Sequence, residues 1–319
     1  MTEIPTVRGP VDTDDLGQVL MHEHVFVLSE EIRRNYPEMW DEEQRVADAV
    51  AKLRALRASG VQTIVDPTVI GLGRDIPRVQ RINEQVDINI VPATGVYTYN
   101  DVPMHLHFQG PGTLFDVPEP MVAMFVKDLT EGIAGTGVRA AFLKCAIDAP
   151  GMTAGVERVM RAVAAAHRET GAPITVHTDV HNQSGLQVLD LFQQEGVDLT
   201  RVVMGHSGDS TDDGYLTRLA DAGCLLGMDR FGLDVLLDFE QRVDTVARLV
   251  ERGYAEHLVL SHDASCHIDW FPPGEVAAAA PNWHYQHITD DVLPALRERG
   301  VTGAQIRTML VDNPRRYFA

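Results

Sequence analysis

The chain has 319 residues, of which 45% are hydrophobic and 23% charged, a balance typical of a globular protein with a large core. Its formal net charge of −19 makes nucleic acid and anionic membrane surfaces poor partners, because their phosphates would repel the protein. No apolar run approaches the roughly 18 residues of a membrane span, and no secretory signal is visible at the N-terminus. The 3 cysteines lie at unrelated spacings, which argues against a disulfide framework and favours a cytoplasmic location.

Short apolar runs alternate with longer amphipathic stretches along the chain. This alternation predicts a parallel sheet covered by helices, and its eightfold repetition predicts a single (β/α)8 barrel over residues 1–319. The expected strands are 17–24, 61–67, 88–95, 138–147, 172–177, 201–206, 223–228 and 257–262. The expected helices include 41–59, 153–170, 240–252 and 290–299, each followed by a glycine, and a last short helix at 303–310.

Two long connections interrupt this rhythm. Residues 97–120 follow the third strand and residues 264–287 follow the eighth, and both are rich in proline and aromatic residues. In a (β/α)8 barrel the loops after the strands surround the active site, so both are expected to cover it. Trp270 and Phe271 of the second loop are predicted to line a substrate channel.

His22-Glu23-His24 closes the first apolar run. Alternation along a strand places residues i and i+2 on one face, so His22 and His24 can point at one metal ion. The same spacing at His105 and His107 shows that this pattern alone is weak evidence. Four later runs also end in polar residues, and parallel strands of a barrel end at one face, which predicts one metal site. These residues are Lys144, His177, His206 and Asp263.

Lys144 distinguishes this set from an ordinary histidine site. It lies in the apolar run Ala140–Ala146, where burial lowers the pKa of the amine and leaves it able to take up carbon dioxide. The resulting carbamate is an anionic ligand able to bridge two metals. The alternatives are a lysine that extends to the barrel mouth or pairs with an aspartate.

The other histidines are expected to have structural or surface roles, as is usual for a single histidine. His262 is expected to point away from the site, because it alternates with Asp263. The remaining ones are His105, His107, His167, His181, His257, His267, His284 and His287.

The ordered set H-x-H, Lys, His, His, Asp resembles the binuclear amidohydrolase superfamily, and in particular the phosphotriesterase-like lactonases of the phosphotriesterase family. The resemblance extends over essentially the whole chain. It rests on Leu20–Val25, Asp66–Thr68, Thr94–Tyr97, Phe142–Lys144, Thr175–Thr178, Gly205–Asp209, Leu260–Asp263 and Asn313-Pro314.

This resemblance implies two divalent metal ions per chain, zinc first and cobalt, manganese or iron as alternatives, with carbon dioxide bound as N6-carboxylysine. It also implies a homodimer. It assigns His22, His24 and Asp263 to the buried ion and His177 and His206 to the exposed ion, with carboxylated Lys144 and a hydroxide between the ions.

In the implied reaction the hydroxide attacks the substrate, and Asp263 accepts its proton and passes it to the leaving alkoxide. Tyr97 would direct its hydroxyl at the substrate oxygen, or serve only as an aromatic lid residue. Arg230 would orient the substrate or hold Tyr97 and the last loop. A structural salt bridge from Arg230 to Asp229 or Asp209 is the alternative.

Tyr97 and the short segment 231–239 resemble the lactonase branch. The implied function is hydrolysis of N-acyl-homoserine lactones (quorum quenching) and of γ- and δ-lactones, with a weak paraoxonase side activity. A dedicated phosphotriesterase is the main alternative. An amidohydrolase acting on cyclic amides and a metal-free ligand-binding barrel are more distant ones.

Overall fold

The computed structural model describes residues 2–272 and 274–319. Eight strands form one sheet in the order of the chain, and all seven neighbouring pairs in it are parallel. The first and last strands meet where the amide of Met21 donates to the carbonyl of Leu260 at 3.3 Å, so the barrel is nearly closed. The strands are β3 (Gln18–Leu20), β5 (Val61–Asp66), β6 (Asn89–Gly95), β7 (Phe142–Ala146), β8 (Ile174–His177), β9 (Val202–Gly205), β10 (Leu225–Met228) and β11 (Leu258–Leu260).

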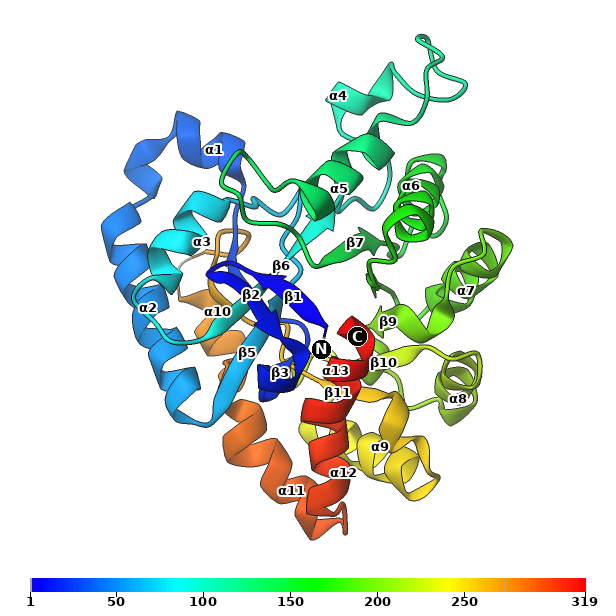
Figure 1. Cartoon of the computed structure of the whole chain (residues 1–319). Coiled ribbons are helices and arrows are strands. Elements are labelled where there is room, and N and C mark those ends of the chain that lie inside the picture. Colours follow the sequence, from blue (N-terminus) through cyan, green and yellow to red (C-terminus); the bar gives the residue numbers. More distant parts are fainter. Residues whose placement is uncertain (1, 273) are drawn as a thin grey trace.

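Helices surround the sheet in Figure 1, which confirms the predicted (β/α)8 architecture. Apolar faces of these helices pack on the outside of the strands, as a parallel sheet buried on both faces requires. The main helices are α2 (Glu42–Ala58), α3 (Ile76–Asn83), α5 (Pro120–Thr130), α6 (Ala154–Thr170), α7 (Ser184–Gln194), α8 (Asp213–Asp221), α9 (Phe239–Glu251) and α11 (Leu293–Glu298). Within the described ranges, none is long and apolar enough to cross a bilayer.

A second, smaller core fills the inside of the barrel. At the N-terminal end of the strands, α13 (Asn313–Phe318) brings Tyr317 into this core, where its hydroxyl lies 3.0 Å from that of Thr175. A hairpin of β1 (Glu3–Thr6) and β2 (Gly9–Asp12), which the sequence did not predict, precedes the first barrel strand. β1 and α13 lie near the middle of the view in Figure 1.

The first predicted strand, 17–24, is wrong in its second half. The barrel strand β3 ends at Leu20, and the chain then bends before β4 (His24–Val27). β4 leaves the barrel sheet and pairs in parallel with β12 (Ser265–Ile268). The amide of His22 donates to the hydroxyl of Ser261 at 2.9 Å instead of joining a strand ladder, so strand alternation does not relate the two histidines.

Other boundaries also differ from the predicted ones. The fourth strand begins at Phe142 rather than at residue 138, and the remaining strands are one or two residues shorter at one or both ends than expected. The predicted helix 290–299 is a π-helical segment, Ile288–Val292, followed by α11. The predicted last helix is α12 (Gly303–Arg307) followed by a π-helical segment, Thr308–Asp312, and α13, so the chain stays helical through Pro314.

The two long connections are partly ordered. Residues 97–120 contain the short helix α4 (Met104–His107), which projects from the barrel in Figure 1. Residues 264–287 contain β12 and α10 (Glu275–Ala279), and Pro273 of this segment lies outside the described residues.

Candidate metal centre

All six predicted ligands line one cavity of about 290 Å³ at the C-terminal ends of the strands. Tyr97, Arg230, Trp270 and Phe271 line the same cavity, so the structure brings together every predicted site residue. Lys144 lies within β7 and His177 ends β8, while His206 and Asp263 directly follow or lie near the ends of β9 and β11. Side chains of the kinds that bind transition metals therefore meet in this cavity from five different strand ends.

The first group of ligand atoms surrounds the carboxylate of Asp263. Its Oδ1 lies 3.4 Å from Nε2 of His22 and 3.3 Å from Nε2 of His24. These three residues offer ligand atoms that all lie within 4.8 Å of one another. The Nε2 atoms of His22 and His24 thus point toward the same place in the cavity. A bend in the chain, and not a continuous strand, orients them in this way.

The second group consists of His177 and His206. Nδ1 of His177 and Nε2 of His206 lie 2.8 Å apart, and their rings meet at a steep angle of 78°. Two imidazole nitrogens that converge in this way offer a pair of donors to one cation.

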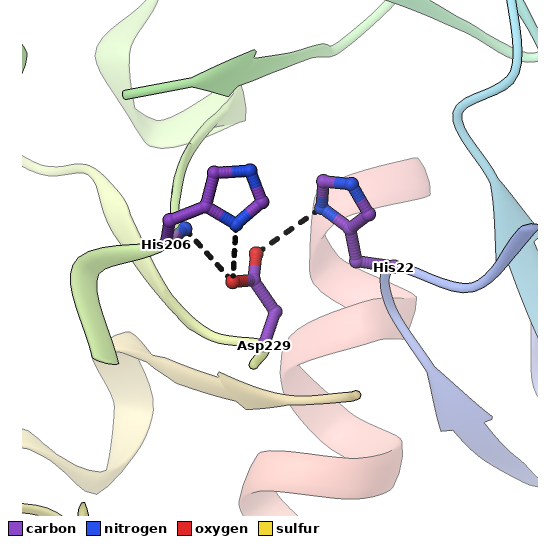
Figure 2. Close-up of side chains that lie close together, drawn as sticks. All are labelled: His22, His206 and Asp229. Carbon is purple, nitrogen blue, oxygen red and sulfur yellow. Dashed lines mark hydrogen bonds and ion pairs between the residues drawn. The ribbon is translucent and has the colours of Figure 1, made fainter. Parts of the chain in front are cut away.

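A partner outside the cavity holds the second ring nitrogen of each of these four histidines. Asp229 lies between His22 and His206 in Figure 2, with Oδ2 at 3.1 Å from Nδ1 of His22 and Oδ1 at 3.0 Å from Nδ1 of His206. Thr68 Oγ1 lies 2.7 Å from Nδ1 of His24, and Asp148 Oδ2 lies 2.5 Å from Nε2 of His177. Each ring is thereby oriented with its free nitrogen toward the cavity, as in metal sites with an ordered outer shell.

These outer partners, Asp229, Asp148 and Thr68, were not predicted as site residues. Asp229 appeared only as a possible partner of Arg230, although it follows β10 directly and so occupies a strand end. Its position after an apolar run was the same signal that identified Asp263. Thr68 and Asp148 directly follow the predicted strands 61–67 and 138–147, so the same signal was present at both positions.

Burial keeps His177 and His206 neutral. Desolvation lowers the pKa of His177 to about 4, against the opposing effect of its hydrogen bond to Asp148. Desolvation, followed by the charge of Arg230, lowers the pKa of His206 well below its ordinary value. A neutral imidazole has a free nitrogen lone pair, so these groups are in the form that binds metals.

Lys144 is 1% exposed, and in the described part of the chain its Nζ has no hydrogen-bond partner. Burial lowers the pKa of this amine to about 8, although Asp263 and Asp229 oppose the shift. A buried amine without a partner is costly unless another group satisfies it. A carbamate on Nζ bound to cations would remove this cost, so the residues fit the implied binuclear group.

Arg230 forms ion pairs with one residue that lines the cavity and with one that lies outside it. The structure contains the predicted ion pair with Asp209, at 3.1 Å, and adds a second, unpredicted one with Asp263, also at 3.1 Å. Arg242, which is buried, holds the other oxygen of Asp209 at 2.6 Å. The alternative contacts from Arg230 to Tyr97 and Asp229 are not among the hydrogen bonds and ion pairs of the described residues.

Tyr97 lies at the edge of the metal-binding groups. Its hydroxyl contacts that of Tyr99 and lies 3.4 Å from Nδ1 of His177. Burial raises the pKa of Tyr97 well above its ordinary value, so the hydroxyl stays protonated and able to donate at neutral pH. Tyr99, which the sequence analysis did not single out, also lines the cavity.

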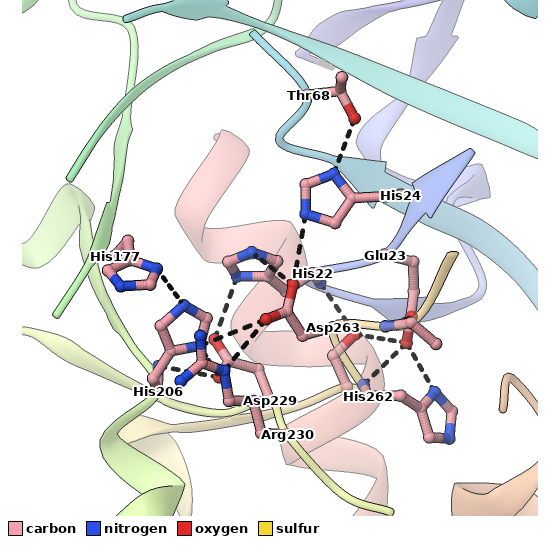
Figure 3. Close-up of polar contacts among 12 residues, drawn as sticks. His22, Glu23, His24, Thr68, His177, His206, Asp229, Arg230, His262 and Asp263 are labelled. Carbon is pink, nitrogen blue, oxygen red and sulfur yellow. Dashed lines mark hydrogen bonds and ion pairs between the residues drawn. The ribbon is translucent and has the colours of Figure 1, made fainter. Parts of the chain in front are cut away.

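The cavity mouth is apolar. Trp270 and Phe271 are 46% and 47% exposed, and Leu233, Val235 and Leu236 face them from the segment after β10. None of the histidines for which a structural role was expected lines this cavity. His262 points away from it as predicted, and Figure 3 shows it bonded to Glu23 on the other side of Asp263.

The chain matches the model of the phosphotriesterase family over residues 2–318. A phosphotriesterase homology protein of Mycobacterium tuberculosis is 59% identical over 319 residues, covering 100% of this chain and 98% of the relative. An aryldialkylphosphatase of Saccharolobus solfataricus is 38% identical, covering 99% of each chain.

Two solved structures of similar proteins also resemble this chain. A structure described as the phosphotriesterase from Mycobacterium tuberculosis superposes with a TM-score of 0.98 at 59% identity, over 99% of this chain and 98% of the other. A structure from a study of organophosphate hydrolysis engineered from a weak promiscuous lactonase template has a TM-score of 0.91 at 34% identity, over 100% of each chain. The chain belongs to the phosphotriesterase family.

Proposed function

We propose that the protein is a binuclear metal-dependent lactonase that hydrolyses N-acyl-homoserine lactones and related γ- and δ-lactones, with a weak phosphotriesterase side activity. The observation that carries this proposal is the composition of the cavity. Six groups suited to two cations lie in it, and its mouth is apolar between Trp270 and Leu236. A polar reacting centre below an apolar wall fits a lactone ring that carries an acyl chain.

Zinc is the metal we propose first, with cobalt, manganese or iron as alternatives, because the donors are nitrogen and oxygen. Two cations held there would lower the pKa of a water molecule and polarise the substrate's carbonyl or phosphoryl oxygen. Carboxylation of Lys144 would convert the buried amine into an anionic ligand, with carbon dioxide as the source.

Side chains of the protein would then transfer the proton and orient the reacting groups. Asp263 would accept a proton from the attacking water and deliver it to the leaving alkoxide. Arg230, 3.1 Å from Oδ2 of Asp263, would hold this carboxylate in place. The hydroxyl of Tyr97 would donate to the substrate oxygen, where charge develops during attack.

A dedicated phosphotriesterase is the second candidate, and the name of the 38% identical aryldialkylphosphatase favours it. Both reactions pass through a species in which the reacting carbon or phosphorus has gained an oxygen, so one site can serve both. A metal-free ligand-binding barrel is the most distant candidate, because all six ligand positions are filled.

The deciding experiment measures the metal content of the purified protein and initial rates on a medium-chain acyl-homoserine lactone and on paraoxon. About two metal ions per chain with faster lactone turnover would support the proposal. Two ions with faster paraoxon turnover would favour the phosphotriesterase. No metal and no activity after adding zinc, cobalt or manganese with bicarbonate would leave only the ligand-binding barrel.

We also propose a cytoplasmic homodimer. The three cysteines are buried and unpaired, which fits a reducing compartment. Met104, Phe108, Leu114 and Phe115 on the projecting connection are each at least half exposed and give a second copy an apolar surface. Light scattering of the purified protein measures the oligomeric state, and a monomer at micromolar concentration would contradict the dimer.

A further inference from the structure

The residue between the two ligand histidines, Glu23, has a carboxylate that faces away from the cavity. It is 0% exposed and does not line the cavity. Figure 3 shows Glu23 and His262 on the opposite side of Asp263 from His206. A fully buried carboxylate is rare unless its environment supplies hydrogen bonds, so its partners indicate what it does.

Four donors from one short segment point at this carboxylate. Oε1 accepts from the hydroxyl of Ser261 at 2.8 Å and from the backbone amide of His262 at 2.9 Å. It also accepts from Nδ1 of His262 at 2.6 Å, and Oε2 accepts from the amide of Ala264 at 3.0 Å. Nε2 of His262 accepts from the amide of Ile288 at 2.9 Å, which assigns the ring proton to Nδ1 and makes that nitrogen the donor to Glu23.

The residue in the middle of this segment is the predicted ligand Asp263, and its backbone is strained. Its φ of 55° lies in the left-handed region that aspartate adopts only at a cost. The amides on both sides of it, those of His262 and Ala264, are held by the one carboxylate of Glu23. The amide of Asp263 itself donates to the carbonyl of His22 at 3.0 Å.

We propose that Glu23 is a positioning residue of the metal centre: it fixes the strained backbone of Asp263 against the segment that carries His22 and His24. It does so at the junction of the first and last barrel strands, where the sheet itself contributes few hydrogen bonds. Glu23 touches neither metal nor substrate. Its effect is on how long the centre retains its cations, and the inference rests on the proposed metal centre.

The principal test replaces Glu23 by glutamine, which keeps the shape but turns one acceptor into a donor. The new side-chain NH2 group would face either the three donors that now bind Oε1 or the backbone amide of Ala264. In either case Glu23 would lose its hydrogen bond to the backbone amide on one side of Asp263. The measured quantities are the zinc content during timed exposure to a chelator and the thermal midpoint of the zinc-free protein. We expect Glu23→Gln to release zinc at least about 10-fold faster than the wild type, as for other outer-shell residues.

A matched control separates this effect from general loss of stability. Asn83 is also fully buried and donates to the carbonyls of Val86 and Ile88 at 3.2 and 2.8 Å, away from the cavity. Asn83→Asp is the reverse isosteric change and should lower the thermal midpoint while zinc release stays at the wild-type rate. Equal release from Asn83→Asp and Glu23→Gln at similar thermal midpoints would overturn the proposal.

A second pair of variants applies if Glu23→Gln does not fold. His262→Leu removes the ring donor to Glu23, whereas His262→Asn keeps a donor near the position of Nδ1, and both lose the acceptor for Ile288. We expect faster zinc release from the leucine variant than from the asparagine variant, and equal release would overturn the proposal. A wild type that binds none of zinc, cobalt, manganese and iron would overturn the proposed function as well. A metal-binding wild type whose metal is released at the same rate from Glu23→Gln would overturn only the role of Glu23.

Discussion

The guanidinium of Arg230 donates through Nε to Oδ2 of Asp263 at 3.1 Å. Burial opposes the charge of this arginine, but Asp263, Asp209 and Asp229 outweigh it and raise the pKa of Arg230, which stays cationic. The carboxylate proposed as ligand and proton acceptor is therefore held by a permanent positive charge. Burial opposes ionisation of Asp263, but its interactions with His22, His24 and His206, and then the charge of Arg230, hold the pKa of this carboxyl well below its ordinary value.

Replacing Arg230 by glutamine should lower kcat/KM for lactones by about 10- to 100-fold, because a hydrogen bond to a charged group contributes about 1.5–3 kcal/mol. Steady-state kinetics on a medium-chain lactone measures the change. Arg248→Gln is the control, since Arg248 pairs with Asp213 at 3.1 Å outside the cavity. Similar losses in both variants would contradict a role at the site.

Tyr97→Phe should lower kcat for lactones by roughly 100-fold, the usual effect of removing one donor to a developing oxyanion. The ring and its packing on Trp270, at 6.4 Å between centroids, would be kept. Tyr254→Phe serves as the control, because the hydroxyl of Tyr254 donates to Asp221 at the surface. Unchanged lactone turnover in Tyr97→Phe would leave this residue as an aromatic lid only.

Reconstitution of the zinc-free protein should depend on bicarbonate and on pH. Only the neutral amine takes up carbon dioxide, and the pKa of Lys144 lies at about 8, so the neutral fraction grows as the pH rises through this value. At a constant concentration of dissolved carbon dioxide, zinc uptake should therefore be several-fold faster at pH 8.5 than at pH 7 by the ordinary titration of one group. Lys144→Met should lose this dependence, and an identical bicarbonate effect in the variant would exclude carboxylation.

Trp270→Ala should change the preference for acyl chains. Loss of apolar contact weakens discrimination by about 1–3 kcal/mol, so kcat/KM for long-chain lactones should fall while that for short-chain lactones stays near the wild-type value. Phe115→Ala is the control, because Phe115 is a similarly exposed aromatic residue outside the cavity. A uniform loss over all chain lengths would contradict an acyl-binding wall.

Acid should destabilise the protein through the ion pairs of Arg78. This arginine lies 2.9 Å from Glu30 and 3.0 Å from Glu42. Burial favours the neutral carboxyls, but hydrogen bonds from Arg33 and Arg78 to Glu30, and from Trp40 and Arg78 to Glu42, lower both pKa values below 4.5. Their stabilising effect is complete above the unfolded pKa of 4.5 and is lost as the pH falls through the lower folded values.

Arg78→Met should therefore reduce the free energy of unfolding by about 2 kcal/mol at pH 7 and flatten its decline below pH 4.5. Urea unfolding of the zinc-free protein at several pH values measures both effects, without the separate pH dependence of metal binding. Parallel pH profiles of variant and wild type would show that these pairs do not contribute.

The sequence by itself determined the barrel and most of the site. Buried parallel strands need apolar runs, and polar residues that end such runs must meet at one face, so Lys144, His177 and Asp263 could be placed without coordinates. The outer partners were a different case. Thr68 and Asp148 directly follow predicted strands, but only the folded backbone shows that they contact the second ring nitrogens of His24 and His177.

The tertiary structure alone decided how the barrel closes at the metal centre. Strand alternation predicted that His22 and His24 share a face, but a bend separates them, and contacts from a segment about 240 residues away fix their geometry. Glu23 and the left-handed backbone of Asp263 belong to the same junction. A local sequence pattern indicates which side chains of one strand are buried. Hydrogen bonds between residues near the two ends of the chain depend instead on how the whole barrel closes.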